Sequence, residues 1–248
     1  VREMVQAGLP LSMLRLSTAV ETETTLKLAG HAKAIDVLER LLRLRGVGEG
    51  KALLMLGYSG AKSLARATLG AAYGITGRHG GVHLGVGGVF GAQWNKARFR
   101  TPYLRNTLWE RGYAVDTLET ATSWTRTPAT IAAIEDALRQ TSEADNERLH
   151  CFTHLSHVYP HGTSIYTSYV FRLSADPDET LARWQRLKQA VSQAVMDNGG
   201  TISHQHGVGT DHAPYLRAEK GALGIDALGA LCRHFDPDGL MNPGKLLL

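Results

Sequence analysis

The sequence is poor in several residue types, and each scarcity excludes a class of protein. It has only two cysteines, Cys151 and Cys232, and so cannot form the disulfide framework of a small secreted domain. It has no run of about 20 uncharged apolar residues, which excludes a membrane-spanning helix. Its formal net charge is only +4, which is weak evidence for nucleic-acid binding. Its densest basic cluster, Lys96, Arg98, Arg100, Arg105 and Arg111, suits a small anionic ligand as well as a phosphate backbone. We therefore expect a reduced, cytoplasmic location and no nucleic-acid partner.

The residues that are present are typical of a globular protein. Hydrophobic residues make up 43% of the chain and charged residues 20%, which excludes disorder as its main state. A chain of 248 residues can bury one sizeable core or two modest ones. Its first residue is Val1 rather than Met, which indicates a processed form or a fragment of a longer protein.

Four segments predict β-strands because they are apolar or rich in aromatic and β-branched residues. They are residues 52–58, 113–120, 149–158 and 164–173. The sequence Tyr159-Pro-His-Gly162 between the last two predicts a hairpin turn.

Helices are predicted between and after these strands. Residues 61–73 follow the first strand, a second helix is expected to begin with Thr127 as its N-cap, and a short one to cover 226–235. The strongest pattern is at 177–198, where Asp176 is the expected N-cap. Its expected buried stripe consists of Leu181, Trp184, Leu187, Val191 and Val195.

This order of elements predicts an α+β fold, an antiparallel or mixed sheet with helices packed on one face, like a ferredoxin-like cap domain. We expect an N-terminal arm at 1–45, the α+β domain at 46–198 and a C-terminal segment at 199–248. The glycine-rich stretch from Gly74 to Gly91 predicts a long loop, because so many glycines disfavour a regular helix or strand.

The first candidate for chemistry is the sequence Ser203-His-Gln-His-Gly-Val-Gly209, which follows the last predicted long helix. His204 and His206 are two residues apart, so an extended backbone would project both in one direction. Imidazole titrates near neutrality and suits proton transfer. A metal pair or two solvated loop histidines are the alternatives.

Four further histidines suggest a zinc site, but strand parity argues against it. His150 and His154 share one face of a strand, His157 falls on the other, and His161 lies in the turn. No carboxylate or thiolate is spaced to complete the set, so we predict no metal site.

Two other residues have suitable chemistry. Tyr166 alternates with Ser164, Ser168 and Arg172 on the polar face of its strand, where a phenol can act as acid or base; a surface tyrosine is the alternative. Arg105 is placed near the start of a short helix, and arginine suits a bidentate grip on carboxylate or phosphate.

Taken together, several motifs resemble the C-terminal part of FAD-linked oxidases of the vanillyl-alcohol oxidase type, with most similarity to the alkyldihydroxyacetonephosphate synthases and their bacterial relatives. The motifs are PYLRN (102–106), DTLET (116–120), GTSIYTSY (162–169), NGGTISHQHGVG (198–209) and FDPDGLMNPGKLL (235–247). The tail motif is common to the superfamily, whereas the His-rich loop is typical of the synthases. Gln205 stands where those synthases carry a central histidine, and glutamine cannot titrate.

The resemblance implies substrate-site roles for particular residues. Arg105 corresponds to an arginine that grips the anionic head of the substrate, and Thr117 to a serine beside it. Tyr166 corresponds to the tyrosine proposed to move a proton, assisted by His204 and His206. Arg15, in Ser12-Met-Leu-Arg-Leu16, corresponds to a further arginine near the flavin.

The resemblance also implies FAD as cofactor, contacted by His206, Gly207 and Asn242, and an anionic small-molecule substrate, with lipid-derived compounds among the candidates. It allows a homodimer. The family's FAD-binding domain precedes this region, and no matching Gly-rich loop precedes position 45. The alternatives are a D-2-hydroxy-acid dehydrogenase or aryl-alcohol oxidase of the same superfamily, or a non-catalytic cap module.

Overall fold

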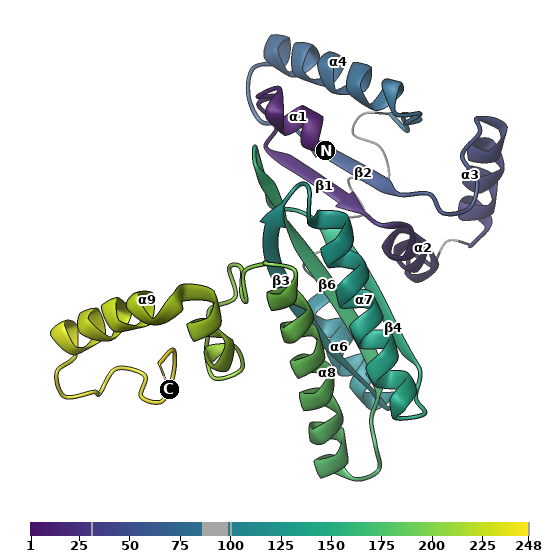
Figure 1. The fold of residues 1–248 in the computed structure, drawn as a ribbon. Helices are drawn as coiled ribbons and strands as arrows, with labels where there is room; N and C mark the ends of the chain where they lie inside the picture. The colour runs from purple at the N-terminus through teal and green to yellow at the C-terminus, as the bar shows by residue number, and fades with distance from the viewer. Residues whose placement is uncertain (31, 86–98, 100, 248) are drawn as a thin grey trace.

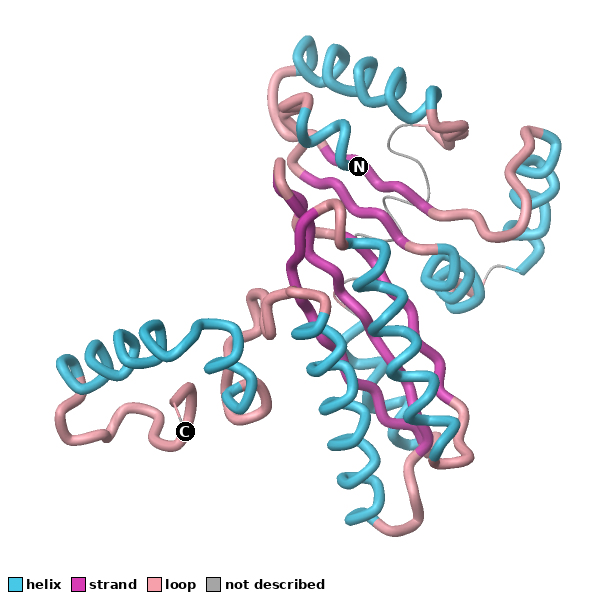
Figure 2. The backbone as a smooth tube through the Cα atoms, in the orientation of Figure 1, coloured by secondary structure: helices cyan, strands magenta, loops and turns pink. Residues whose placement is uncertain are grey.

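A computed structural model describes residues 1–30, 32–85, 99 and 101–247 (Figures 1 and 2). In chain order its elements are α1 (Arg2–Gln6), β1 (Met13–Ser17), α2 (Ala19–Leu28), α3 (Ala32–Leu44), β2 (Leu53–Gly57), α4 (Lys62–Arg78), α6 (Thr101–Glu110), β3 (Tyr113–Ser123), α7 (Thr127–Ala144), β4 (Leu149–Leu155), β5 (Val158–Tyr159), β6 (Gly162–Arg172), α8 (Pro177–Asp197) and α9 (Ala213–Phe235).

The strands form one antiparallel sheet in the order β2-β1-β4-β6-β3, with the short β5 paired to β6. β3 and β6 are its longest pair, in register from Tyr113 opposite Arg172 to Ser123 opposite Gly162. Tyr159 pairs with Gly162, which confirms the predicted hairpin turn. The α+β fold with an antiparallel sheet is confirmed.

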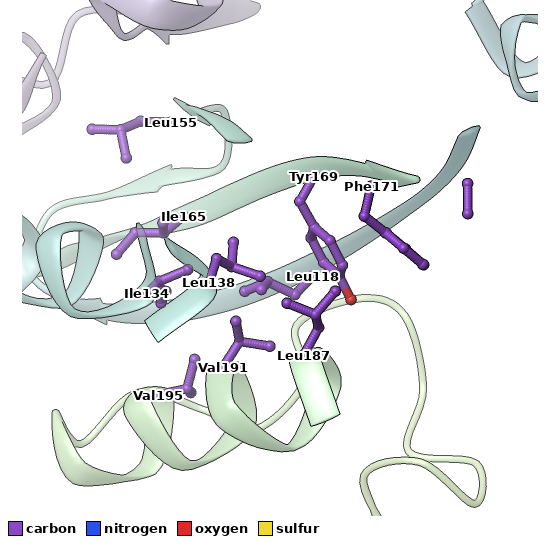
Figure 3. Close-up of a cluster of buried hydrophobic side chains, with 11 residues drawn as sticks. Leu118, Ile134, Leu138, Leu155, Ile165, Tyr169, Phe171, Leu187, Val191 and Val195 are labelled. Carbon is purple, nitrogen blue, oxygen red and sulfur yellow. The ribbon is translucent and has the colours of Figure 1, made fainter. Parts of the chain in front are cut away.

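The main core lies between one face of the sheet and the helices α7 and α8, which run side by side across it (Figure 1). Strand alternation turns Ile165, Tyr169 and Phe171 of β6 toward these helices. Figure 3 shows these side chains meeting Leu187, Val191 and Val195 of α8, as the predicted helical stripe requires. Each fully buried apolar side chain contributes about 1.5–3 kcal/mol to folding.

The opposite face of the same strands is polar. The register places Glu119 of β3, Tyr166 of β6, His154 of β4 and Ser17 of β1 in one row across the sheet. The helix α6 packs on β3 and lies behind the sheet in Figure 1, on the side away from α7 and α8. The predicted polar face for Tyr166 is confirmed.

Two further parts extend from this central layer. β1 and β2 continue the sheet, and a second apolar cluster of Met4, Leu14, Ala72 and Ile75 joins them to α1 and α4. The helix α9 projects away from the sheet and packs mainly against α8 (Figure 1). None of the helices that the structure describes is both long and apolar enough to cross a lipid bilayer.

The sequence did not predict the strand Met13–Ser17, which lies within the expected N-terminal arm. This strand occupies an interior position of the sheet, between β2 and β4. Five residues give too short an alternation to identify on their own. The division into segments 1–45, 46–198 and 199–248 stays a prediction, and the sheet draws strands from the first two segments.

Several helix predictions were wrong in detail. The N-cap of α7 is Arg126 rather than Thr127, whose hydroxyl instead donates to the carbonyl of Ser123. Leu181 is 51% exposed and does not belong to the buried stripe. The predicted helix at 226–235 is the second half of α9, which begins at Ala213 and kinks at Gly221.

The predicted glycine-rich loop from Gly74 to Gly91 is also partly wrong. Residues 74–78 continue α4 as regular helix, because Ala72 and Ile75 are buried there and tertiary packing outweighs the low helix propensity of glycine. Residues 86–91 lie outside the described part of the chain.

Candidate functional site

The chain after α8 is fixed to the free edge of β3. The backbone amide of Thr201 donates to the carbonyl of Ala121 over 3.1 Å, and that of His204 to the carbonyl of Glu119 over 3.0 Å. The hydroxyl of Thr201 also accepts from the amide of Ala121, and the hydroxyl of Thr120 donates to the carbonyl of Thr201. These bonds satisfy the exposed edge of the strand and hold the His-rich loop beside Glu119.

Glu119 is the centre of a cluster of imidazoles. Its side chain is 3% exposed, and its Oε1 lies 2.8 Å from Nδ1 of His157 and 3.0 Å from Nδ1 of His204. Its Oε2 lies 3.3 Å from Nε2 of His206. The other ring nitrogen of His204 contacts the hydroxyl of Tyr159 at 3.0 Å. A buried carboxylate therefore orients three imidazoles from two segments of the chain.

The surroundings of Glu119 favour its charged form. Burial alone would raise the pKa of its carboxyl, but the hydrogen bonds from His157 and His204 outweigh burial and hold that pKa below its ordinary value.

Tyr166 lies between this cluster and a second one. Its ring stacks on His154 with the ring centroids 4.8 Å apart, and the ring of His206 meets it edge-on at 5.6 Å. The backbone of Gln205, between the two loop histidines, is left-handed with φ 61°. The loop is therefore not extended there, yet both imidazoles reach the same carboxylate.

The second cluster joins β1, α2 and β4. Nη2 of Arg15 donates to Oε1 of Glu21 over 2.8 Å, and Nδ1 of His154 lies 2.9 Å from the same oxygen. Burial alone would raise the pKa of Glu21, but the hydrogen bond from His154 and the charges of His154 and Arg15 keep it below its ordinary value. The Arg15 guanidinium is thus held in place beside the His154–Tyr166 stack.

An open cavity of about 1550 Å³ is lined by the polar face of the sheet and by α6, and at the end of β6 its lining continues to the start of α8 on the other side of the sheet. Four of the predicted substrate residues line it: Arg15, Arg105, Thr117 and Tyr166. Arg105 is exposed on α6, and Thr117 lies opposite Ser168 on the same face as Tyr166. The structure therefore brings to one cavity residues that are distant in the sequence.

The remaining predicted residues lie beside or beyond this cavity. His204 and His206 are not among its lining residues. Both contact the carboxylate of Glu119, which pairs with Tyr166 in the sheet. The carbonyl of Gly207 accepts a bond from the hydroxyl of Ser203, and Asn242 is exposed in the C-terminal tail. This tail returns to the loop through the amide of Leu246, which donates to the carbonyl of Gly209.

Sequence reasoning missed Glu119, Glu21, His154, His157 and Tyr159 as members of the site. The alternation of side chains along β3 could have identified Glu119, because it lies on the same face of the strand as Thr117. His157 was expected within a strand, whereas β4 ends at Leu155 and the His157 side chain contacts Glu119 of β3. No local pattern places Glu21 beside His154, since 133 residues separate them.

The sequence matches one protein family, described as FAD linked oxidases, C-terminal domain, over residues 1–246. The alkyldihydroxyacetonephosphate synthase of Trypanosoma brucei brucei is 24% identical over 234 residues, which cover 94% of this chain and 37% of the relative. The glycolate oxidase subunit GlcD of Bacillus subtilis (strain 168) is 43% identical over 65 residues, 25% of this chain and 14% of the relative.

A solved structure of alkyldihydroxyacetonephosphate synthase shares the fold, with a TM-score of 0.74 and 19% identity over 99% of this chain and 42% of that one. The chain thus spans well under half of the length of these relatives.

Proposed function

The chain belongs to the FAD-linked oxidases, through their C-terminal domain, and from this premise we propose that it forms the substrate-binding region of a flavoenzyme. Its substrate would be an anionic, lipid-derived small molecule, as in the alkyldihydroxyacetonephosphate synthases that it resembles. The proposal rests mainly on one observation. Tyr166 stands on the wall of a large cavity, between the Arg15–Glu21–His154 cluster and His206.

The polar part of the cavity suits an anionic head group. Arg15 is 17% exposed, and Glu21 restrains its guanidinium, so it can bind an anion with little loss of side-chain entropy. Arg105 faces the same cavity from α6 and adds a second cation. Two guanidinium groups at this cavity, one from β1 and one from α6, would hold a phosphate or carboxylate by charge-assisted hydrogen bonds.

The rest of the cavity suits an apolar chain. Along β6, the lining changes from Tyr166 to Ser168 to Val170, in steps of about 7 Å. Beyond Val170 the walls are mainly apolar, and they include Leu108, Trp109, Leu173, Leu181 and Trp184. This gradient favours an amphiphile with its anionic end near Arg15 and its hydrocarbon toward α8.

The loop and tail have open positions that fit a flavin. Nothing lies within 4 Å of the point where a Cβ would stand on Gly207, so a planar group can approach this backbone closely. His206 is 34% exposed at the side chain and Asn242 is exposed, so both can contact a cofactor. We propose that these three residues hold part of the FAD. When bound, the flavin supplies the N5 atom at which the substrate carbon reacts.

In this proposal the residues of the chain bind, orient and exchange protons. Arg15 and Arg105 orient the anionic substrate, and Thr117 contacts it from β3. The hydroxyl of Tyr166 gives or takes a proton at the reacting group, with His206 at its edge. Both ring nitrogens of His204 are engaged, with Glu119 and Tyr159, so His204 acts by holding the loop and its network in position.

The test uses the flavin-loaded enzyme that contains this region, with an acyl ester of dihydroxyacetone phosphate and a long-chain alcohol as substrates. Tyr166→Phe removes the hydroxyl and keeps the ring, so we expect kcat to fall by about 10²–10⁴-fold, as for the loss of a general acid or base. The flavin absorbance of the purified enzyme should not change. Steady-state kinetics of the wild type and of Tyr166→Phe measure the change in kcat.

The matched control is Tyr113→Phe, on the same face of the sheet but outside the cavity lining. It should leave kcat unchanged. Equal activity of Tyr166→Phe and wild type would overturn the catalytic role of this site.

A second candidate function is oxidation of a D-2-hydroxy acid by the same site. It is favoured by the 43% identity to a glycolate oxidase subunit over 65 residues. Flavin bleaching by lactate or glycolate under anaerobic conditions, without reaction of the acyl ester, would support this candidate over the first. The cytoplasmic location and the homodimer stay predictions, and size-exclusion chromatography with light scattering tests the second.

A further inference from the structure

The imidazoles around Glu119 form more than a hydrogen-bond network, and we propose that Glu119, His157 and His204 bind a divalent transition-metal ion. Oε1 of Glu119 and Nδ1 of each histidine all lie within 4.8 Å of one another. In the part of the chain that the structure describes, no other set of three such side chains converges in this way. The spacing of the histidines in the sequence predicted no metal site, because Glu119 and His204 are distant from His157 in the chain.

The chemistry of the three ligands selects the kind of ion. Two imidazole nitrogens and one carboxylate oxygen suit Zn²⁺, Fe²⁺ or Co²⁺, whereas Mg²⁺ and Ca²⁺ prefer oxygen ligands alone. With metal–ligand bonds of about 2.0–2.1 Å, tetrahedral ligand atoms stand about 3.3 Å apart. The Nδ1 atoms lie 2.8 and 3.0 Å from Oε1, so each nitrogen needs to move from this oxygen by only a few tenths of an ångström, and the two nitrogens already lie within 4.8 Å of each other.

The surroundings fit the outer requirements of a metal site. To bind an ion through Nδ1, each imidazole must be neutral and carry its proton on Nε2. On His204 that Nε2–H would then donate to the hydroxyl of Tyr159, which already lies 3.0 Å away, and this fixes the ring in the binding tautomer. His157 is 42% exposed at the side chain and so leaves a path for an ion to enter from solvent.

A metal ion would also compensate the buried charge. Glu119 is 3% exposed, and the described cations at its carboxylate are imidazoles, which carry charge only when protonated. His206, with Nε2 at 3.3 Å from Oε2, lies at the other oxygen of the carboxylate and outside this set of three ligands. The ion would join β3, the connection between β4 and β5, and the loop after α8.

The test titrates the chelator-treated 248-residue chain with Co²⁺ and Zn²⁺, by absorption spectroscopy and by calorimetry. We expect one ion per chain, the visible absorption of four- or five-coordinate Co²⁺, displacement by Zn²⁺ and no competition by Mg²⁺. Glu119→Gln and His157→Ala should each weaken binding by at least about 100-fold, more than the loss of an outer contact.

The control is His150→Ala, which removes an exposed histidine outside the set and should change nothing. Thermal melts show whether each variant is folded, and the half-exposed His157 provides a variant that should fold even if Glu119→Gln does not. Absence of stoichiometric binding at micromolar ion, or equal binding by His157→Ala and wild type, would overturn the proposal. The titration measures metal binding and not turnover, so its outcome does not depend on the proposed catalytic function.

Discussion

At the scale of residues, buried carboxylates organise the polar groups of this protein. On the cavity side of the sheet, Glu119 holds several imidazoles, and Glu21 holds the imidazole of His154 and the guanidinium of Arg15. On the core side the half-buried Asp116 holds other groups: its Oδ2 accepts bonds from the hydroxyl of Tyr169 and the indole of Trp184, each at 2.8 Å. Such bonds to a charged acceptor are worth about 1.5–3 kcal/mol each.

Asp116 provides a prediction for the pH dependence of stability. Burial alone would raise the pKa of this carboxyl, but the charge of Lys188 and the bond from Trp184 keep it below its ordinary value. A folded-state pKa below the unfolded value, about 3.9, stabilises the protein above that pH. The contribution is lost as the pH falls through the folded-state pKa.

We therefore expect Asp116→Asn to lower the free energy of unfolding by about 1–3 kcal/mol at pH 7. The difference from wild type should shrink below about pH 4, because asparagine does not titrate. Urea unfolding at several pH values measures it. Asp136→Asn, at a carboxylate with its side chain 56% exposed in an ion pair with Arg139, is the control and should change stability little at any pH. A constant gap between Asp116→Asn and wild type from pH 7 to pH 2 would contradict this account.

At the scale of elements, β3 decides where the site forms. It pairs with β6 on one side, and its other edge receives the loop that carries His204 and His206. The turn into β6 brings the backbone at Gly162 against the end of β3, where a Cβ would collide with the carbonyl oxygen of Thr122. Glycine at this position lets the hairpin close onto β3.

Gly162→Ala should therefore destabilise the protein, by about 1–3 kcal/mol, because backbone must move to admit the methyl group. The matched substitution is Gly70→Ala, in the interior of α4, where a Cβ meets nothing within 4 Å. That change should stabilise the protein by up to about 1 kcal/mol through helix propensity. Denaturant melts of both variants test the pair, and the same sign for the two would refute the steric explanation.

At the scale of the whole molecule, packing is uneven. The sheet with α7 and α8 has a continuous core, while α9 contacts α8 and extends away from the sheet (Figure 2). Apolar side chains of α9 and of the tail after it are exposed. Leu223 is 83% exposed, Phe235 79% and Met241 78%. Because little apolar surface is buried there, we expect α9 and the tail after it, the C-terminal arm, to unfold locally at a much lower free energy than the sheet.

Limited proteolysis should show this difference. Trypsin should cut first after Arg217 or Lys220, which are exposed just before the kink at Gly221. Arg186 is exposed on α8 and gives an internal control, since its helix packs on the core. Mass spectrometry of early digests identifies the cuts. Cleavage at Arg186 as early as at Lys220 would show that the arm is no less stable than the core.

The sequence by itself determined the layers of the fold and the family of the chain. The period-two alternation in β6 put Tyr166 on the polar face and Tyr169 in the core, and both placements were correct. The helix pattern and the N-cap Asp176 located α8 almost to its ends. These features are local, so a window of some ten residues holds all the information that they need.

Only the tertiary structure decided which side chains meet. Residues 119, 157 and 204 converge because β3 pairs with β6, β4 ends before His157, and the loop binds the edge of β3. Likewise Arg15 reaches His154 only because a five-residue strand inserts between β2 and β4. Such meetings depend on strand order and register, which many distant contacts fix together and no local pattern encodes.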